Sequence, residues 1–392
     1  MRSKQKMVSK LKFRSEQLFT GLEMLDETQV LVTNDQGVVE GIVPAEDAGD
    51  DVQLLDGIIS PGFINTHCHL ELSHLKNVIP EGTGLVDFVM GVMHQRNFAE
   101  ETILAAIEAQ EQVMYNNGIV AVGDICNTAH SFAQKQKGKL HYYNFIEVSG
   151  FVPQFADKRF EQGLTIYNQA TDKESSAIVP HAPYSTSLQL MQLVNEHSKG
   201  KVITIHNQET KEEEDFFITG DSKFRKLFDT FNIDISFYKP YGQNSLRVYL
   251  PYLNKASSIL LVHNTFTTLP DVQFALDEAA LFNHDLYWAL CVNANLYIEK
   301  KLPPVYLLRD HECTITLGTD SLASNHGLSI LEEIKTIRKN FPEIELEEIL
   351  QWATYNGAKA LQMSKHLGSF EKGKQPGVLL MDENLKQVKR LV

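Results

Sequence analysis

From about Ser60 onward, the chain alternates short apolar runs with longer amphipathic segments. Apolar runs of four to eight residues bounded by turn residues are typical of buried strands, and apolar residues at helical spacing indicate helices. The predicted strands are Ile58–Asn65, Ile119–Ile125, His141–Val148, Ala177–Val179, Val202–Ile205, Ile259–Val262, Leu286–Cys291 and Thr314–Leu317. The predicted helices are Glu101–Asn116, Leu188–His197, Asp271–Phe282, Leu328–Lys339 and Leu346–Leu361.

Eight strands separated by helices predict an α/β fold, a (β/α)8 TIM-like barrel, with a doubly wound open sheet as the alternative. The barrel is favoured because polar residues follow nearly every strand at its carboxyl end, where barrel active sites lie. Gln29–Ile42 has a strand–turn–strand pattern, and Gly368–Gly373 followed by Val378–Met381 resembles hairpin material. We therefore predict a small β-sandwich formed by residues 1–60 and 365–392, and a barrel over residues 61–364.

An unusually long connection separates the strand Val202–Ile205 from the strand Ile259–Val262. It opens with the charged run Lys211–Asp215, followed by Phe216 and Phe217. Long connections in compact domains often cover a functional site. The sequence leaves two interpretations of residues 210–250, a lid over a site or a surface feature.

Composition narrows the class of protein. The chain has 36 Lys and Arg against 50 Asp and Glu, a net charge of −14, which argues against nucleic-acid and anionic-membrane partners. Its four cysteines are too few and too scattered for a disulfide framework and fit a reducing, cytoplasmic compartment. No apolar stretch has the pattern of a signal peptide or of a membrane span. We expect a cytoplasmic globular protein, and the sequence leaves a homodimer open.

The segment Pro61–His69 carries the strongest chemical signal. Strand side chains alternate between faces, so His67 and His69 point the same way and can share one metal ion, while Cys68 points away. An isolated pair of this kind is common by chance. Further polar residues at the ends of other predicted strands strengthen the signal: His181, His206, His263 and Asp320.

Histidines and a carboxylate gathered at one end of a barrel suit a catalytic Zn²⁺ with an open position for water. The same nitrogen and oxygen donors would also accept Fe²⁺. A bound metal would lower the pKa of water toward neutrality and so supply a nucleophile. Attack on an sp² carbon then requires a general base and a general acid nearby.

These motifs, in this order, resemble the amidohydrolase superfamily. Gly57–His69 resembles its opening metal motif, and Gly368–Lys374 resembles its C-terminal signature. His206–Glu209 and Gly318–Asn325 resemble the mononuclear aminohydrolase branch, which includes guanine, cytosine, S-adenosylhomocysteine and aminodeoxyfutalosine deaminases and triazine hydrolases. No lysine ends the third or fourth strand, unlike the two-metal branches.

The resemblance implies a role for each motif residue. The implied ligands of one metal ion are His67, His69, His206 and Asp320. Glu209 would carry a proton to the substrate ring, His263 would orient the attacking water, and Asp320 would take the water proton. The implied substrate-binding residues are His181, Glu147, Asn295 and Ser324. Gly84–Val89 lies where such enzymes place a lid helix.

The expected activity is a metal-dependent deamination that replaces an exocyclic amine of a purine-like ring with oxygen and releases ammonia. The leading substrate class is an adenine nucleoside derivative, with aminodeoxyfutalosine first, followed by guanine and S-adenosylhomocysteine. One alternative is hydrolysis of a cyclic amide or a chlorotriazine at the same metal. A distant alternative is a barrel without catalytic activity, which is disfavoured because every motif position is filled.

Overall fold

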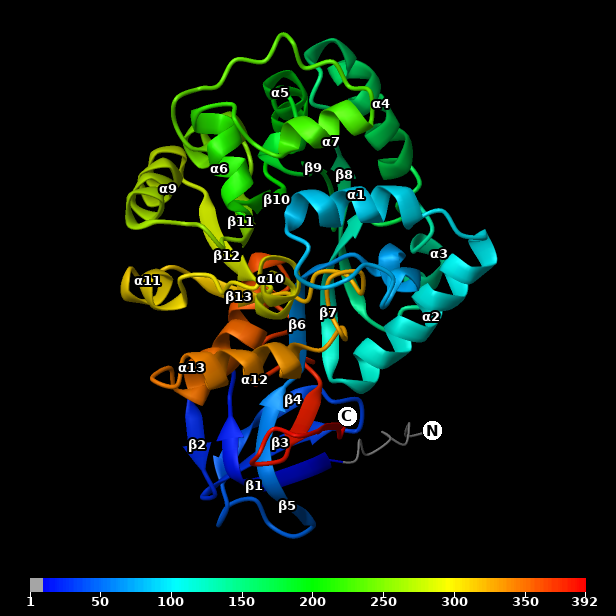
Figure 1. Cartoon of the computed structure of the whole chain (residues 1–392). Coiled ribbons are helices and arrows are strands. Elements are labelled where there is room, and N and C mark those ends of the chain that lie inside the picture. Colours follow the sequence, from blue (N-terminus) through cyan, green and yellow to red (C-terminus); the bar gives the residue numbers. More distant parts are fainter. Residues whose placement is uncertain (1–9) are drawn as a thin grey trace. The chain divides into compact units, whose positions relative to one another are not determined.

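The computed structural model describes residues 10–392 of the chain (Figure 1). Its barrel strands are β6 (Phe63–Cys68), β7 (Ile119–Cys126), β8 (His141–Val148), β9 (Ser176–Pro180), β10 (Val202–Asn207), β11 (Ser258–His263), β12 (Asp285–Leu290) and β13 (Ile315–Leu317). Hydrogen bonds join them into two four-stranded sheets, β6-β7-β8-β9 and β10-β11-β12-β13. Strands bounded on both faces by other elements are expected to be uniformly apolar, and β7, β9 and β11 are buried along their whole length.

Backbone contacts close the two sheets into a ring. The His206 N–H donates to the His181 carbonyl, at 3.0 Å, beside the ends of β9 and β10. On the other side, Cys68 and Asp320 form a parallel bridge, and the N–H groups of Thr319 and Asp320 donate to the His67 carbonyl. The chain therefore has the predicted TIM-barrel-like α/β fold, and the open-sheet alternative is wrong.

Helices follow most of the barrel strands, and Figure 1 shows α2, α4, α5 and α9 at the periphery of the strands. The helices are α1 (Leu85–Gln95), α2 (Glu100–Asn116), α3 (Phe132–Lys135), α4 (Ala156–Tyr167), α5 (Leu188–His197), α6 (Lys211–Ile218), α7 (Phe224–Thr230), α8 (Ser245–Tyr249), α9 (Leu269–Phe282), α10 (Val292–Glu299), α11 (Val305–Asp310), α12 (Ile330–Asn340), α13 (Leu346–Gln351) and α14 (Gly357–Ala360). The predicted helix Leu346–Leu361 is interrupted by a π-helical turn, Trp352–Asn356.

Both ends of the chain contribute to one mixed seven-stranded sheet, as predicted for the terminal β-structure. Its strands are β1 (Lys10–Phe19), β2 (Met24–Asp26), β3 (Gln29–Asn34), β4 (Val39–Pro44), β5 (Val52–Pro61), β14 (Val378–Met381) and β15 (Val388–Arg390). The antiparallel pairing of β14 with β5 joins the two ends, with Leu379 opposite Ser60. Buried apolar side chains from both ends pack together, including Phe13, Ile59 and Val378.

Two local expectations were wrong, and one strand was missed. The predicted strand Ile58–Asn65 is two strands, β5 and β6, which are interrupted at Gly62. A side chain at Gly62 would collide with Val120 and the Pro376 carbonyl, so the chain turns there at a residue without Cβ. The segment Gly368–Gly373 forms no strand, and β1 was not predicted.

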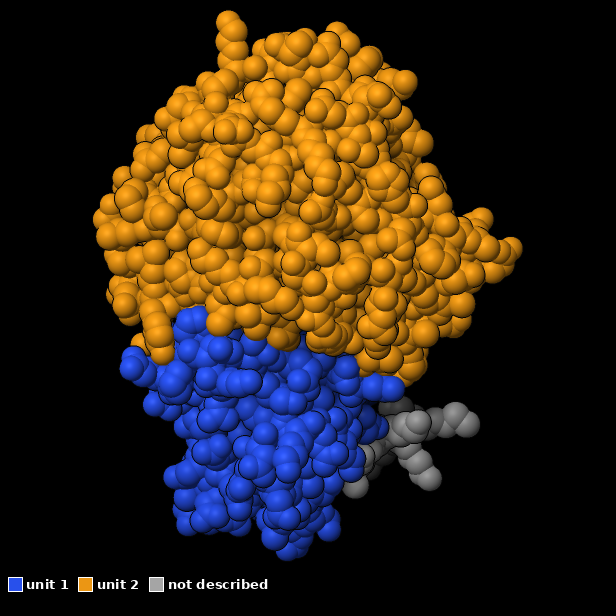
Figure 2. Space-filling model, in the orientation of Figure 1, with its two compact units in different colours: residues 1–64, 114–120, 329–392 blue, residues 65–113, 121–328 orange. Residues whose placement is uncertain are grey.

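The chain divides into two compact units, residues 1–64, 114–120 and 329–392, and residues 65–113 and 121–328 (Figure 2). Compact units and fold domains are different divisions of a chain, so the predicted domain boundaries stay a prediction. Every candidate site residue belongs to the second unit. Within residues 10–392, no helix combines the length and the apolar character that a membrane crossing requires.

Candidate active site

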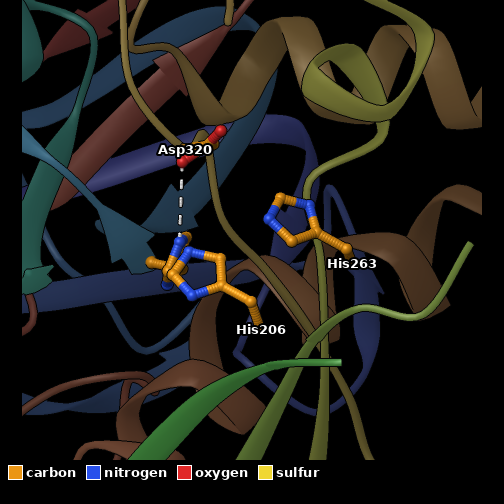
Figure 3. A group of neighbouring side chains, drawn as sticks. His206, His263 and Asp320 are labelled. Atoms are coloured by element: carbon orange, nitrogen blue, oxygen red, sulfur yellow. Dashed lines mark ion pairs between the residues drawn. The ribbon is translucent and has the colours of Figure 1, made fainter. Parts of the chain in front are cut away.

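The candidate site lies at the carboxyl ends of the barrel strands. β6 ends beside His67 and His69, β10 carries His206, β11 ends at His263, and Asp320 follows β13. Figure 3 shows the side chains of His206, His263 and Asp320 converging on a common space from separate elements. The barrel therefore brings together residues that are up to about 250 positions apart in the sequence.

The donor atoms have the spacing that a single metal ion requires. His69 Nε2 lies 3.2 Å from Asp320 Oδ1 and 3.4 Å from His206 Nε2, and His67 Nε2 lies 3.6 Å from Asp320 Oδ1. Two ligand atoms on a tetrahedral ion, each at about 2.0–2.1 Å from the metal, are roughly 3.3 Å apart. Both ring nitrogens of His67 and the Nε2 atom of His263 are buried without a hydrogen-bond partner.

These observations fit a divalent metal. His67, His206, His263 and Asp320 each offer a donor atom within 4.8 Å of the others. His69 contacts two members of this group, as its distances to Asp320 and His206 show. Which of the five side chains bind the ion stays a prediction, and His67, His69, His206 and Asp320 remain our predicted set.

The protonation states suit a cation. Burial lowers the pKa of His69 to about 3 and the pKa of His206 well below its ordinary value, so both rings are neutral near pH 7. Burial alone would raise the pKa of Asp320, but the neighbouring His67 and His69 hold it well below its usual range. Neutral imidazoles and an ionised carboxylate are the forms that bind metal.

Two candidate ligands have partners that fix their orientation. His206 Nδ1 lies 2.8 Å from the His181 carbonyl oxygen, so Nδ1 carries the proton and Nε2 is left for the metal. Asp320 Oδ2 accepts a hydrogen bond from Ser324 Oγ, at 2.5 Å, while Oδ1 faces the histidines. Each of these two side chains is therefore held through the atom opposite its candidate donor atom.

Glu209 and His263 form a second pair beside the ligands. Glu209 Oε1 lies 3.5 Å from His263 Nε2, and burial together with the charges of Asp320 and Glu299 raises the pKa of Glu209 well above its ordinary value. Glu209 reaches this place through Gln208, which has a left-handed φ of 44°. The chain does not turn helically between His206 and Glu209, yet the two side chains reach one locale.

The predicted substrate-binding residues fall into two groups. His181 and Glu147 line the cavity above the site. Glu147 Oε1 accepts a hydrogen bond from Asn127, and its buried Oε2 atom has no hydrogen-bond partner but lies 3.6 Å from His206 Nδ1. Burial raises the pKa of Glu147 to about 7. Asn295 and Ser324 are not among the described residues that line the cavity. They contact His263 and Asp320, and their predicted role toward substrate stays a prediction.

A cavity of about 780 Å³ rises from the candidate ligands. This volume lies within the range of about 300–1,000 Å³ that is typical of small-molecule sites. α1 and the long connection after β10 both line it, and their lining side chains include Leu85, Phe88, Leu227, Phe228 and Phe237. Residues 210–250 therefore contribute a cover to the cavity, and the predicted lid segment Gly84–Val89 lies at the start of α1.

Several cavity residues were missed by sequence reasoning. Asn127, Phe151, Arg96 and Arg159 all line the cavity. Asn127 and Phe151 lie just beyond the ends of β7 and β8, so the strand-end rule that found the ligands could have found them. Arg96 and Arg159 belong to surface-like polar segments, and no local pattern distinguishes them.

Comparisons with known proteins agree with this geometry. The profile of the Amidohydrolase family matches residues 58–390. An adenosine deaminase from Helicobacter pylori is 25% identical over 344 residues, which are 85% of this chain and 81% of the relative.

Two solved structures share the fold. A crystal structure of H. pylori aminofutalosine deaminase in complex with methylthio-coformycin has a TM-score of 0.81 at 21% identity, covering 97% of this chain and 100% of that chain. An adenosine deaminase from Xanthomonas campestris with bound zinc has a TM-score of 0.72 at 20% identity, covering 95% of this chain and 84% of that chain. With its buried histidine and aspartate cluster, the chain belongs to the Amidohydrolase family, in its branch of metal-dependent deaminases.

Proposed function

We propose that this protein hydrolyses the exocyclic amine of an adenine nucleoside derivative and releases ammonia, with aminodeoxyfutalosine as the first candidate substrate. The observation that carries the proposal is the Glu209–His263 pair, which lies next to the candidate metal ligands on the floor of a covered cavity. The similarity to an adenosine deaminase and to an aminofutalosine deaminase supports the substrate class.

The chemistry divides among the residues of this chain. A divalent metal held by His67, His69, His206 and Asp320 would supply Lewis acidity and lower the pKa of water. Burial raises the pKa of Glu209 well above its ordinary value, which favours its protonated form, and Glu209 would deliver this proton to the ring nitrogen next to the amine. His263 would orient the water, and Asp320 would accept the water proton. The balance is one amine and one water consumed, and one carbonyl and one ammonia formed.

We propose one Zn²⁺ as the resident ion. Three imidazole nitrogens and one carboxylate oxygen with an open position are the donor set of a catalytic zinc site, and the X. campestris relative was solved with zinc. Fe²⁺ accepts the same donors, and metal analysis of the protein as purified distinguishes the two. A cytoplasmic location and a homodimer stay predictions.

The test is an ammonia-release screen on the zinc-loaded full chain. The compounds are adenosine, aminodeoxyfutalosine, S-adenosylhomocysteine, guanine, a cyclic amide and a chlorotriazine. Ammonia from adenine nucleosides supports the proposal. Turnover restricted to the cyclic amide or the chlorotriazine overturns the deaminase activity, and turnover of guanine alone overturns the nucleoside class. A zinc-loaded protein without any activity would support the non-catalytic alternative.

The role of Glu209 has its own test. Glu209→Gln should keep zinc and lose deamination by about 10²–10⁴-fold, because general acid–base catalysis contributes that much. Glu111→Gln is the matched control. Glu111 is also a fully buried carboxyl, and its side chain accepts hydrogen bonds from Gln134 and Tyr142, which like Glu111 are not among the described residues that line the cavity. Near-normal activity of Glu209→Gln would remove Glu209 from the mechanism.

A further inference from the structure

A buried ion pair lies behind the first two candidate ligands. Asp124, on β7, is fully buried, and its Oδ2 atom lies 2.5 Å from Lys135 Nζ, on α3. Lys135 Nζ also donates to Asn144 Oδ1 at 2.8 Å, and it lies 5.0 Å from the centre of the Tyr142 ring. Burial alone would lower the pKa of Lys135, but Asp124 raises it, so the lysine stays charged.

The other carboxylate oxygen of Asp124 binds the backbone directly after His69. Asp124 Oδ1 accepts a hydrogen bond from the backbone N–H of Leu70, at 2.8 Å. Asp124 lies 54 positions after Leu70 in the sequence, so this contact ties two distant parts of the chain together. Leu70 directly follows His69 and begins the 3₁₀ turn Leu70–Leu75, whose first residue receives no cap from the His69 side chain. The first N–H groups of a helical turn have no partner within the turn, so Asp124 supplies the missing acceptor.

His69, like His67, lacks the Nδ1 hydrogen-bond partner that the other histidines of the site have. His206 and His263 each have a partner for Nδ1, the His181 carbonyl and the Asn295 side chain. His69 Nδ1 is buried without any hydrogen-bond partner. Metal-binding histidines usually have their second nitrogen fixed in this way. The position of the His69 ring is therefore set through its backbone rather than through its ring.

A second carboxylate reinforces the same segment. Glu71 Oε2 accepts hydrogen bonds from the backbone N–H of Thr128, at 2.9 Å, and from Thr128 Oγ1, at 2.7 Å. The two residues after His69 are thus tied to β7 and its following loop, once by the Asp124 side chain and once by the Glu71 side chain. The Asp124 contact is the one next to His69, and it is the one whose acceptor is held by a buried cation.

We propose that Asp124, held by Lys135, is a positioning residue that fixes His69 in the metal centre. The proposal rests on the metal centre of the proposed function. Replacing a buried ion pair with apolar residues of similar volume is often neutral for stability, so stability alone gives this pair no clear purpose. Holding the backbone next to His69 would give the Asp124–Lys135 pair a purpose. Residues that orient a metal ligand typically contribute about 10- to 100-fold to metal affinity.

The test compares zinc affinity with stability in the full chain. The main variant is Asp124→Leu with Lys135→Met, which removes both buried charges together and also removes the acceptor of Leu70. The control is Glu111→Gln, which changes a buried carboxyl in the same part of the barrel without touching residues 67–71. Zinc dissociation constants come from competition with a chromophoric chelator, and unfolding midpoints of the metal-free proteins come from urea titration.

We expect the double variant to bind zinc about 10- to 100-fold more weakly, with a changed visible spectrum of the cobalt-substituted protein. The control should match the unaltered protein in zinc affinity and in the cobalt spectrum. A double variant that is less stable but has an unchanged zinc affinity and cobalt spectrum would show a merely structural role and overturn the inference. An unaltered protein that binds no zinc would instead overturn the proposed function.

A measurement on the unaltered protein covers the case in which the double variant does not fold. Amide hydrogen exchange of the metal-free chain should show a slowly exchanging Leu70 N–H, with protection comparable to that of the β7 amides. Exchange of Leu70 at the rate of an exposed loop, in a protein whose β7 amides stay protected, would show that Asp124 does not hold this segment. That result would also overturn the inference.

Discussion

Replacing Asn295 with leucine tests whether this residue positions His263 or contacts the substrate. Asn295 Oδ1 accepts from His263 Nδ1 at 3.0 Å, and Asn295 Nδ2 donates to the His263 carbonyl at 3.2 Å and to Thr265 Oγ1 at 2.8 Å. His263 is the last residue of β11 and has a left-handed φ of 73°. One amide side chain thus holds both the ring and the backbone of a residue in an unusual conformation.

The magnitude follows from these contacts. Each neutral hydrogen bond contributes about 1 kcal/mol net, and two of the three act on His263 directly. Leucine fills the same space and makes none of them, so we expect a loss of about 2–3 kcal/mol in the orientation of His263. If this loss falls on the transition state, kcat falls roughly 30- to 160-fold. The zinc content should not change, because Asn295 contacts none of the four predicted ligands among its described hydrogen bonds.

Steady-state ammonia release with the best substrate of the screen distinguishes the roles. A positioning role lowers kcat and leaves KM unchanged, whereas a substrate contact raises KM. Asn195→Leu is the matched control, since Asn195 is a buried asparagine bonded to Asn254 and Lys255 outside the cavity lining, and its folded fraction should keep full activity. A kcat of the Asn295 variant within threefold of the unaltered protein would refute the reasoning.

Three further variants test other parts of the site. Ser324→Ala removes the hydrogen bond to Asp320 Oδ2 and should weaken zinc binding about tenfold, measured by competition with a chelator. An unchanged zinc affinity would show that Ser324 does not position Asp320. Phe228→Ala opens the cavity cover and should cost about 3–5 kcal/mol in urea unfolding while raising KM, and a stability loss without any rise in KM would remove Phe228 from substrate binding. Burial raises the pKa of Glu213 to about 8, so the folded chain keeps a proton that the unfolded chain releases from about pH 4.5 upward. The stability of the unaltered protein therefore falls as pH rises between these values. The melting temperature of Glu213→Gln should rise relative to that of the unaltered protein as pH goes from 5 to 8. A difference that stays constant with pH would contradict the raised pKa of Glu213.

The strand-end rule explains why much of the barrel and of the site was predictable. Buried parallel strands are short apolar runs, and the residue that ends such a run faces the same end of the barrel as its counterparts. His67, His206, His263 and Asp320 were all found by this rule, and the structure brings them together. The rule needs no knowledge of loops, because the hydrogen-bonded barrel fixes where every strand ends.

Two kinds of feature were not predictable from the sequence: a strand whose alternation of buried and exposed residues is interrupted, and backbone conformations held by contacts between distant residues. The alternation along β1 changes phase at an irregularity between Ser15 and Gln17, so a period-two search loses the strand. Gln208, Asn264 and Asp320 have left-handed backbones, yet none is a glycine that would mark such a turn. Tertiary hydrogen bonds hold these conformations, such as the N–H of Asn264 on the Asn207 carbonyl, and no local pattern encodes them.

Three buried carboxyl groups line the cavity, and their surroundings give each a different state. Asp320 faces histidines and stays ionised, as a cation ligand must. Glu209 faces His263 within a buried environment that favours its protonated form, as a proton donor to a neutral ring requires. Burial raises the pKa of Glu147 to about 7, so near neutral pH its carboxyl could either accept a hydrogen bond from a substrate hydroxyl or donate one to it. Separated pKa values among like groups are how one site assigns acid and base roles, so burial beside different neighbours, rather than residue type, would divide the chemistry here.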